Sequence, residues 1–326
     1  MHLPSIIIYS LAFLLGTTGN GLVIYVTGFN MKKTVNAVWF LNLAVADFLF
    51  TAFLLFSIVN LYKEFDWPFG EFLCKLNTLV GALNMFASIF ILTAISLDRC
   101  LATWVVVWAQ NKRTPRKAEI ICIIIWVAAL VCSLPFPLFR VVKIYNTTNW
   151  RVCQYEFPNG LQTYKQLIIF RFVVCFLIPF LIIVGSYLAI CVRIRSLHRE
   201  RTFKSIRVIL AVILAFFVCW LPFHVFQFLD LKSKLQPGSI PNEAVVNVGL
   251  TVSSSLAFFN SCLNPFLYVF MCKDFKNKFR KSFQAVLEGA FSEDFYYFRN
   301  SRRSQCSRSS LSTGMEHRNH TATSLV

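Results

Sequence analysis

Long apolar stretches separated by short polar ones run through most of the chain. Seven of them reach about 20 residues or more, the helical length that spans a hydrocarbon core of roughly 30 Å. They lie near residues 6–29, 36–61, 74–103, 118–139, 164–192, 206–231 and 244–271. This pattern predicts an all-α membrane protein, with a seven-transmembrane helix bundle over residues 1–271.

A different pattern follows the seventh stretch. Phe275, Phe279 and Phe283 recur at helical spacing, and basic residues fill the other faces. The spacing predicts an amphipathic juxtamembrane helix over 272–288 that lies along the inner leaflet. Residues 289–326 are rich in serine and arginine, a composition that predicts a disordered cytoplasmic tail.

The distribution of charge predicts the orientation. The chain has 326 residues, of which 56% are hydrophobic and 14% charged, and its net charge is +17. Most lysines and arginines fall on one side of the predicted bundle, as in the run Lys112, Arg113, Arg116 and Lys117. Because basic loops stay in the cytoplasm, we expect the N-terminus outside and the C-terminus inside. The basic excess therefore reflects topology, and we expect no nucleic-acid binding.

Two of the eleven cysteines, Cys74 and Cys153, fall on the outer side of this topology. The exterior is oxidising, and neither cysteine has another possible partner there, so we expect a disulfide between them. Asn146 begins an Asn-Thr-Thr sequence in an outer loop, which predicts glycosylation.

An acid lies in the middle of the second apolar stretch, where an ionisable group is costly unless paired, solvated or protonated. One interpretation is a structural hub of hydrogen bonds. The other is a polar cluster that holds a sodium ion, because carboxylate and hydroxyl oxygens suit a hard cation. Its members, all at comparable depth, would be Asp47, Ser88, Asn260, Ser261 and Asn264. We expect no other metal or cofactor.

Prolines interrupt three of the later stretches. Each proline leaves the carbonyl four residues earlier without its helical donor and bends the helix. The prolines are Pro179, Pro222 and Pro265, and the carbonyls belong to Cys175, Val218 and Ser261.

Together these residues resemble the rhodopsin-like (class A) G-protein-coupled receptors, from about Gly19 to Phe283. The matching positions, in order, are Asn20, "LAVAD" ending at Asp47, Cys74, "DRC" from Asp98, Trp126, Pro179, Tyr187, "CWLP" from Cys219, and "NPFLY" from Asn264. The resemblance implies a plasma-membrane receptor. It places the activation switch at Asp98, Arg99, Tyr187, Trp220, Pro222, Asn264, Pro265 and Tyr268.

In that family Asp98 would hold Arg99 at rest and release it toward Tyr187 and the G protein on activation. A partly buried arginine needs its carboxylate until another partner replaces it.

Several stretches resemble the chemoattractant branch, which holds the formyl peptide, chemerin-type and second prostaglandin D receptors. They include "WPFG", "LNMFAS", "VWAQNKRT" and "SLAFFNSCLNP". The branch implies coupling to an inhibitory-type G protein, in leukocyte chemotaxis and inflammation.

Arg171 has two interpretations. It either snorkels to the lipid headgroups or, as the branch implies, pairs with an anionic group of a peptide or lipid ligand. Formyl peptide receptors add a second arginine and an acid, but those positions here are Leu167 and Ala82. The rest of the expected pocket is Met85, Phe223, His224, Gln227, Leu250 and Ser254. A single histidine such as His224 is more often a packing or hydrogen-bonding residue than a ligand-binding one. Basic residues at the mouth would attract an acidic ligand: Arg140, Lys143, Arg151 and Lys165.

One departure from the family keeps a second function open. A proline usually follows the arginine of the triplet by seven residues, with a histidine before it in this branch, but here Val105 and Val106 take these places. That loop touches the G protein, so a decoy or arrestin-only receptor is an alternative. A transporter is a further, less favoured alternative, because it would need paired charges along a path through the helices and few charged residues interrupt them. The sequence contains no nucleophile–base set and no phosphate-binding glycine loop, so we do not expect an enzyme.

The tail offers candidate partner sites. Serines near arginines would become phosphates that arrestin-type partners bind: Ser301, Ser304, Ser307, Ser309, Ser310 and Ser312. The last three residues, 324–326, suit a scaffold domain that captures a C-terminal carboxylate.

Overall fold

The computed structural model describes residues 3–145, 149–197, 203–236, 238 and 243–271. Within these ranges seven helices are long and apolar enough to cross a membrane, as the sequence predicts. The elements are α1 (Leu3–Tyr25) with its π-helical extension η1 (Val26–Asn30), α2 (Val35–Tyr62), α3 (Gly70–Trp104), α4 (Val106–Lys112), α5 (Pro115–Ser133), α6 (Pro135–Leu138), β1 (Arg140–Tyr145), β2 (Trp150–Tyr155), α7 (Leu161–Phe172), η2 (Val173–Leu177), α8 (Ile178–Leu197), α9 (Phe203–Leu235) and α10 (Glu243–Met271).

Several predictions fall outside the described residues and stay predictions. They are the amphipathic helix at 272–288, the tail at 289–326 with its serines, and the glycosylation site at Asn146. The Tyr268 side chain is likewise outside the described part.

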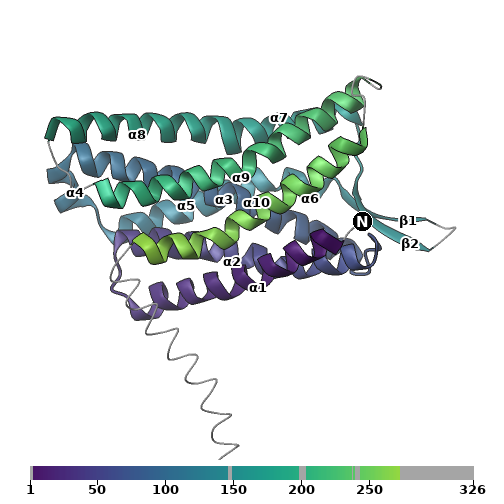
Figure 1. The fold of residues 1–326 in the computed structure, drawn as a ribbon, viewed down its shortest axis with the longest axis horizontal. Coiled ribbons are helices and arrows are strands. Elements are labelled where there is room, and N and C mark those ends of the chain that lie inside the picture. Colours follow the sequence, from purple (N-terminus) through teal and green to yellow (C-terminus); the bar gives the residue numbers. More distant parts are fainter. Residues whose placement is uncertain (1–2, 146–148, 198–202, 237, 239–242, 272–326) are drawn as a thin grey trace, which may run out of the picture. The chain divides into compact units, whose positions relative to one another are not determined.

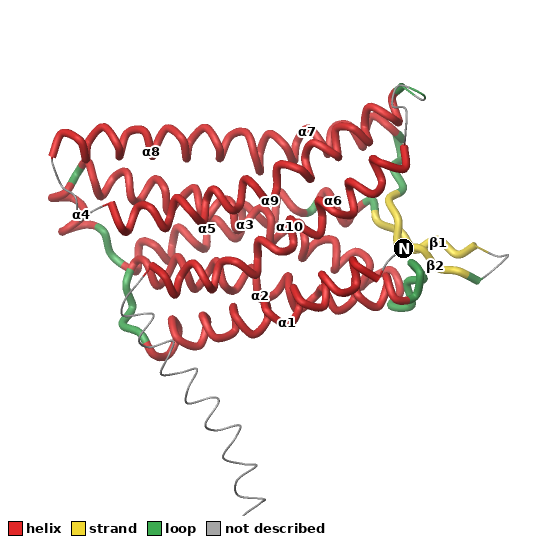
Figure 2. The backbone as a smooth tube through the Cα atoms, viewed as in Figure 1, coloured by secondary structure: helices red, strands yellow, loops and turns green. Residues whose placement is uncertain are grey.

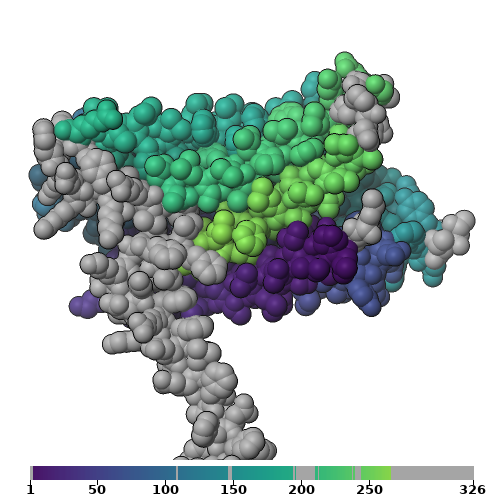
Figure 3. Space-filling model, viewed as in Figure 1, coloured from purple at the N-terminus to yellow at the C-terminus, as the bar shows by residue number. Residues whose placement is uncertain are grey.

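The long helices form one bundle and run along roughly one axis (Figures 1 and 2). α3 packs against α2, α5 and α8, while α10 packs against α1 and α9. The space-filling view shows α8, α9, α10 and α1 in succession across one face (Figure 3). The β1–β2 hairpin marks one end of the bundle, called the hairpin end below, and α4 marks the other, called the α4 end.

The helices turn apolar side chains outward. On α5, Ile123, Val127 and Val131 are all more than half exposed, whereas Cys122 and Ala129 are buried against the bundle. Such a surface is favourable in lipid, which accepts apolar side chains but no unpaired backbone groups. The exposed face of α5 therefore faces the hydrocarbon region.

Helix α10 contains Pro265, and a residue of α1 replaces the hydrogen bond that this proline removes. The Ser261 carbonyl, which the proline deprives of its helical donor, accepts a hydrogen bond from Asn20 Nδ2 of α1 at 2.9 Å. Next to Asn20, a Cβ on Gly19 would lie only 3.1 Å from Pro265 Cγ. The glycine therefore lets α1 approach closely enough to supply the missing hydrogen bond.

The helix that contains Pro179 is interrupted by a π-helical segment. The five-residue π-helical segment η2 separates α7 from α8 and ends at Leu177, just before the proline. A π segment adds a residue to the turn and changes which way the preceding side chains face. It therefore helps to set the direction of Arg171, two residues before η2.

Two contacts, one covalent and one ionic, anchor the hairpin. The predicted disulfide between Cys74 and Cys153 is present. The Asp66 carboxylate accepts hydrogen bonds from the Arg151 backbone N–H at 3.0 Å and from Nη2 at 3.0 Å. The side-chain bond from Arg151, followed by the backbone bond, lowers the pKa of Asp66. The stabilisation from this pair is therefore present above the ordinary carboxyl pKa of about 4 and is lost only as the pH falls through the lowered value.

Close packing of α1 on α2 gives a first prediction. A Cβ on Gly16 would overlap the Thr51 side chain, whose hydroxyl donates to the Asp47 carbonyl at 2.8 Å. Since Thr51 cannot turn away without losing this bond, Gly16→Ala should cost about 1–3 kcal/mol of stability. The measurement is the melting temperature of the chain purified in detergent. Gly28→Ala is the matched control, because a Cβ there meets nothing within 4 Å; equal melting temperatures for the two variants would contradict the prediction.

Candidate functional site

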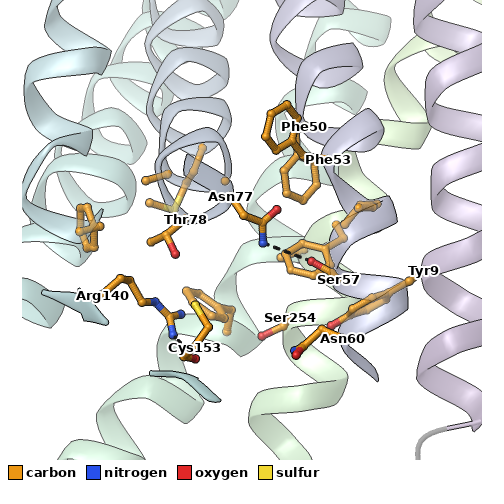
Figure 4. Close-up of a pocket in the computed structure, with 18 of the residues that line it drawn as sticks. Tyr9, Phe50, Phe53, Ser57, Asn60, Asn77, Thr78, Arg140, Cys153 and Ser254 are labelled. Atoms are coloured by element: carbon orange, nitrogen blue, oxygen red, sulfur yellow. Dashed lines mark hydrogen bonds between the residues drawn. The ribbon is translucent and has the colours of Figure 1, made fainter. Parts of the chain in front are cut away.

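Two adjacent cavities lie at the hairpin end of the bundle, with volumes of about 340 and 640 Å³. The first reaches among α1, α2, α3 and α10 (Figure 4), and the second extends toward α7 and α9. Residues common to both linings form a shared wall, consisting of Phe136, Arg140, Tyr155, Arg171, Phe223 and Ser254.

Arg171 extends from α7 into the shared wall. Its Nη2 donates to Gln227 Oε1 of α9, and its guanidinium carbon lies 5.3 Å from the Phe136 ring centroid and 5.0 Å from that of Phe223. Among the described residues no carboxylate pairs with it. Aromatic faces and one amide oxygen thus hold a cation that offers five N–H donors.

Arg140 is the second cation of the wall and begins β1. Its Nη1 donates to the Cys153 carbonyl at 3.1 Å, and its guanidinium carbon lies 3.8 Å from the Tyr155 ring centroid. It too lacks a carboxylate partner within the described part of the chain. The sequence placed Arg140 only at the mouth, whereas the disulfide-bonded hairpin turns it into both cavities. Figure 4 shows it beside Cys153, across from Ser57 and Asn60.

The other predicted pocket residues divide into two groups. Phe223 and Ser254 line both cavities, Met85 lines the first and Gln227 the second. Of the described side chains, His224 and Leu250 line neither cavity. His224 is buried among aromatic rings, 5.6 Å from Phe172 and 5.1 Å from Phe176 between centroids. The His224 side chain points from α9 toward α7 and η2. It therefore contributes to helix packing and not to the pocket lining.

The first cavity has an apolar floor and a polar strip. Phe258 packs on Tyr9 and Phe50 with centroid separations of 5.2 and 5.1 Å. The polar strip includes Ser57 and Asn77. The hydrogen bond from Asn77 to Ser57 is long, at 3.4 Å, and therefore weak. This cavity therefore suits a ligand part that is mainly apolar.

An acid near the second cavity is already paired. Asp230 of α9 accepts hydrogen bonds from the Tyr164 hydroxyl and, at 2.7 Å, from Lys234 Nζ. Lys234 also lies 4.5 Å from the Tyr164 ring centroid. Asp230 thus does not neutralise Arg140 or Arg171, and the shared wall keeps a positive charge.

A row of aromatic side chains on α9 continues from the first cavity toward the centre of the bundle. Trp220 lines the first cavity and packs between Phe223 and Phe216, with centroid separations of 5.7 and 5.8 Å. Phe223 in turn touches Arg171. All three aromatic residues belong to α9 and flank its Pro222.

At the centre of the bundle, the Asp47 carboxylate is fully buried. Its Oδ1 accepts from Asn84 Nδ2 at 2.9 Å and its Oδ2 from Asn264 Nδ2 at 2.6 Å. Ser261 donates to Asn84 Oδ1 at 3.3 Å, and Asn84 reaches Ser88 Oγ at 3.5 Å. Asn84 is therefore the central partner that sequence reasoning missed, although its position one turn from Ser88 was a signal.

The sodium site that the sequence predicts around Asp47 stays a prediction. Asn84 and Asn264 each donate one N–H to a different oxygen of Asp47, and each carboxylate oxygen can accept more than one contact. Asn260 is buried, and its Oδ1 has no hydrogen-bond partner among the described residues. The hydrogen bonds around Asp47 agree with the interpretation as a structural hub.

The hub yields a second prediction. Asn84→Ala removes the donor to a buried carboxylate oxygen and leaves that oxygen unsatisfied, so stability should fall by about 1–3 kcal/mol. The melting temperature in detergent measures the loss. Asn77→Ala, which removes only a 3.4 Å bond to Ser57, is the control. A larger effect at Asn77 than at Asn84 would rule out the central role of Asn84.

At the α4 end the structure corrects the expected pairing of the switch residues. Asp98 pairs with Arg113, not with Arg99: Arg113 Nε and Nη2 donate to the two carboxylate oxygens at 2.8 Å each. Arg113 thus occupies both oxygens of the carboxylate that the sequence assigned to Arg99. Arg99 Nη2 instead donates to Asn36 Oδ1 at 2.6 Å, and the Tyr187 side chain is buried.

Comparison with known proteins agrees with this architecture. Three similar relatives are Chemerin-like receptor 1 of Homo sapiens (40% identical; 89% of this chain and 80% of the relative covered), the C3a anaphylatoxin chemotactic receptor of Danio rerio (43%; 92% and 81%) and Formyl peptide receptor 2 of Mus musculus (40%; 89% and 86%). The model of the rhodopsin family of seven-transmembrane receptors matches residues 19–268. Such receptors are not enzymes; they lie in the membrane, bind a ligand and act through a heterotrimeric G protein. The chain belongs to the rhodopsin family of seven-transmembrane receptors, in its chemoattractant branch.

Proposed function

We propose that this receptor binds a chemoattractant that carries an anionic group, as part of a peptide or a lipid mediator. The observation that carries the proposal is the shared wall, where Arg140 and Arg171 lie without a carboxylate partner among the described residues. A carboxylate or similar anion satisfies both guanidinium groups through charge-assisted hydrogen bonds. The snorkelling interpretation of Arg171 is disfavoured by its contacts with Gln227 and two rings inside the bundle.

The cavity linings also indicate how the ligand would lie. With its anion at the shared wall, the apolar part of the ligand lies against Phe50, Phe53 and Phe258 of the first cavity. Ala82 and Leu167, which replace the acid and second arginine of formyl peptide receptors, themselves line the two cavities. These replacements favour a ligand other than formyl-methionine peptides.

For signalling, we place the hairpin end outside the plasma membrane and the α4 end in the cytoplasm, in contact with an inhibitory-type G protein. The disulfide at the hairpin end and the basic loops at the other support this orientation. α4 is helical although Val106 replaces the usual proline, and Val107 is 70% exposed. An exposed apolar residue on this loop suits a protein partner. The chemotactic name of one relative supports a role in chemotaxis.

The anion site gives a third prediction. In cells that express the receptor, an agonist from a panel of acidic peptides and lipid mediators should lower cAMP. Arg171→Ala should reduce agonist potency about thirtyfold or more, because truncating a buried charged partner costs about 2 kcal/mol or more. Arg140→Ala should also reduce potency.

The controls for this test separate charge from folding. Lys165→Ala removes an exposed cation from the same helix as Arg171. Lys165 lines neither cavity, so its loss weakens only the attraction at the mouth and should change potency by less than about threefold. Surface expression, measured with an epitope tag, should match wild type in all variants. Undiminished potency in both arginine variants would exclude the anion site.

The valines of the second inner loop keep the alternative function testable. In a decoy or arrestin-only receptor, an agonist recruits arrestin without lowering cAMP. We expect a cAMP response in the wild-type chain, and Val106→Pro should change it less than about threefold, since α4 is already helical and begins at this residue, where proline is tolerated. Parallel cAMP and arrestin measurements decide: arrestin recruitment alone, with a cAMP response gained in Val106→Pro, would establish the decoy.

A further inference from the structure

The contacts around Asp98 define a cluster of four side chains at the α4 end. Arg113 binds both oxygens of Asp98, and its Nη2 also donates to Asn36 Oδ1 at 2.8 Å. Arg99 donates to the same Asn36 oxygen at 2.6 Å. Asn36 therefore accepts from two guanidinium groups, and Arg113 occupies the carboxylate that would otherwise attract Arg99.

This pair is more than a surface contact. The side chains of Arg113 and Asp98 are only 21% and 11% exposed, and the bidentate geometry of a guanidinium on a carboxylate is its strongest arrangement. Exposed ion pairs contribute little, but shielding from water makes this one costly to break.

Arg113 is also placed to couple the loop to α3. It ends α4 with an extended backbone, and Thr114 caps α5 directly after it. It is therefore the residue through which the loop helix α4 is joined to Asp98 of α3 and Asn36 at the start of α2. A displacement of α4 would pull Arg113 from the carboxylate.

We propose that Arg113 is a positioning residue for receptor activation: by occupying Asp98 it holds Arg99 away from that carboxylate, in the orientation used for the G protein. The second inner loop thereby controls the switch, because only an ordered α4 presents Arg113 to Asp98. Without Arg113, Asp98 turns to Arg99 and the switch closes. The proposal rests on the G-protein coupling proposed above.

The test measures basal nucleotide exchange of a purified inhibitory-type G protein on the full chain in lipid nanodiscs. Arg113→Ala should lower exchange by roughly fivefold or more, the scale of coupling between linked states. Asp98→Asn in the same chain should restore exchange, because it removes the charge that captures Arg99. Arg116→Ala, an exposed arginine three positions later, should leave exchange unchanged. Low exchange in the Arg113→Ala/Asp98→Asn double variant, or unchanged exchange in Arg113→Ala, would overturn the proposal.

A second measurement does not depend on the G protein. Amide hydrogen exchange in α4 should rise in Asp98→Asn, and rise further in Arg113→Ala, which also removes the hydrogen bond to Asn36. The double variant should match Arg113→Ala, because Asp98 acts on α4 through Arg113. Additive increases would show that Arg113 orders α4 independently of Asp98 and would reject the proposal. If the wild-type receptor gives no nucleotide exchange, either at rest or with any member of the ligand panel above, the proposed G-protein coupling fails, and this measurement alone decides the role of Arg113.

Discussion

A polar side chain inside a membrane-spanning bundle must find its partners within the protein, because lipid offers none. The Asp47 carboxylate imposes this requirement most strongly, since it is fully buried and both oxygens need donors. Asn84 and Asn264 supply them, which ties α2 to α3 and α10. One turn before Asn264 on α10, the Ser261 carbonyl accepts a hydrogen bond from Asn20 of α1. Four helices are thus fixed in register around one carboxylate, and the positions of both ends of the bundle depend on it.

The shared wall of the two cavities follows the opposite rule, because its two cations lack an acidic partner within the described part of the chain. Arg140 and Arg171 are held by rings, a carbonyl and an amide, which stabilise a cation less than a carboxylate does. The acid that lies nearby, Asp230, is occupied by Tyr164 and Lys234. Local departures from full pairing are expected where a protein binds a ligand. In the proposed function, the arrangement that lowers stability here would give the anion of the ligand its binding energy.

The sequence was sufficient for features that depend on local pattern and on membrane topology. It predicted the seven helices, the disulfide, and the grouping of Asp47 with Asn264 and Ser261, because depth in the membrane follows from position in each helix. It misplaced contacts that depend on loops. Arg140 enters the cavities only through the folded hairpin, and Arg113 reaches Asp98 only through α4.

A link between the cavities and the α4 end requires an element with two arrangements that both sites influence, and α9 has the features of one. It contains Pro222, and the aromatic residues that flank the proline lead from Arg171 into the bundle. Arg171 belongs to α7, whereas its amide partner Gln227 belongs to α9. In the proposed function a ligand anion competes with this neutral acceptor and, being charged, binds the guanidinium more strongly. In that case binding would weaken a direct connection between α7 and α9 about one turn from Pro222, the point at which α9 lacks a helical hydrogen bond.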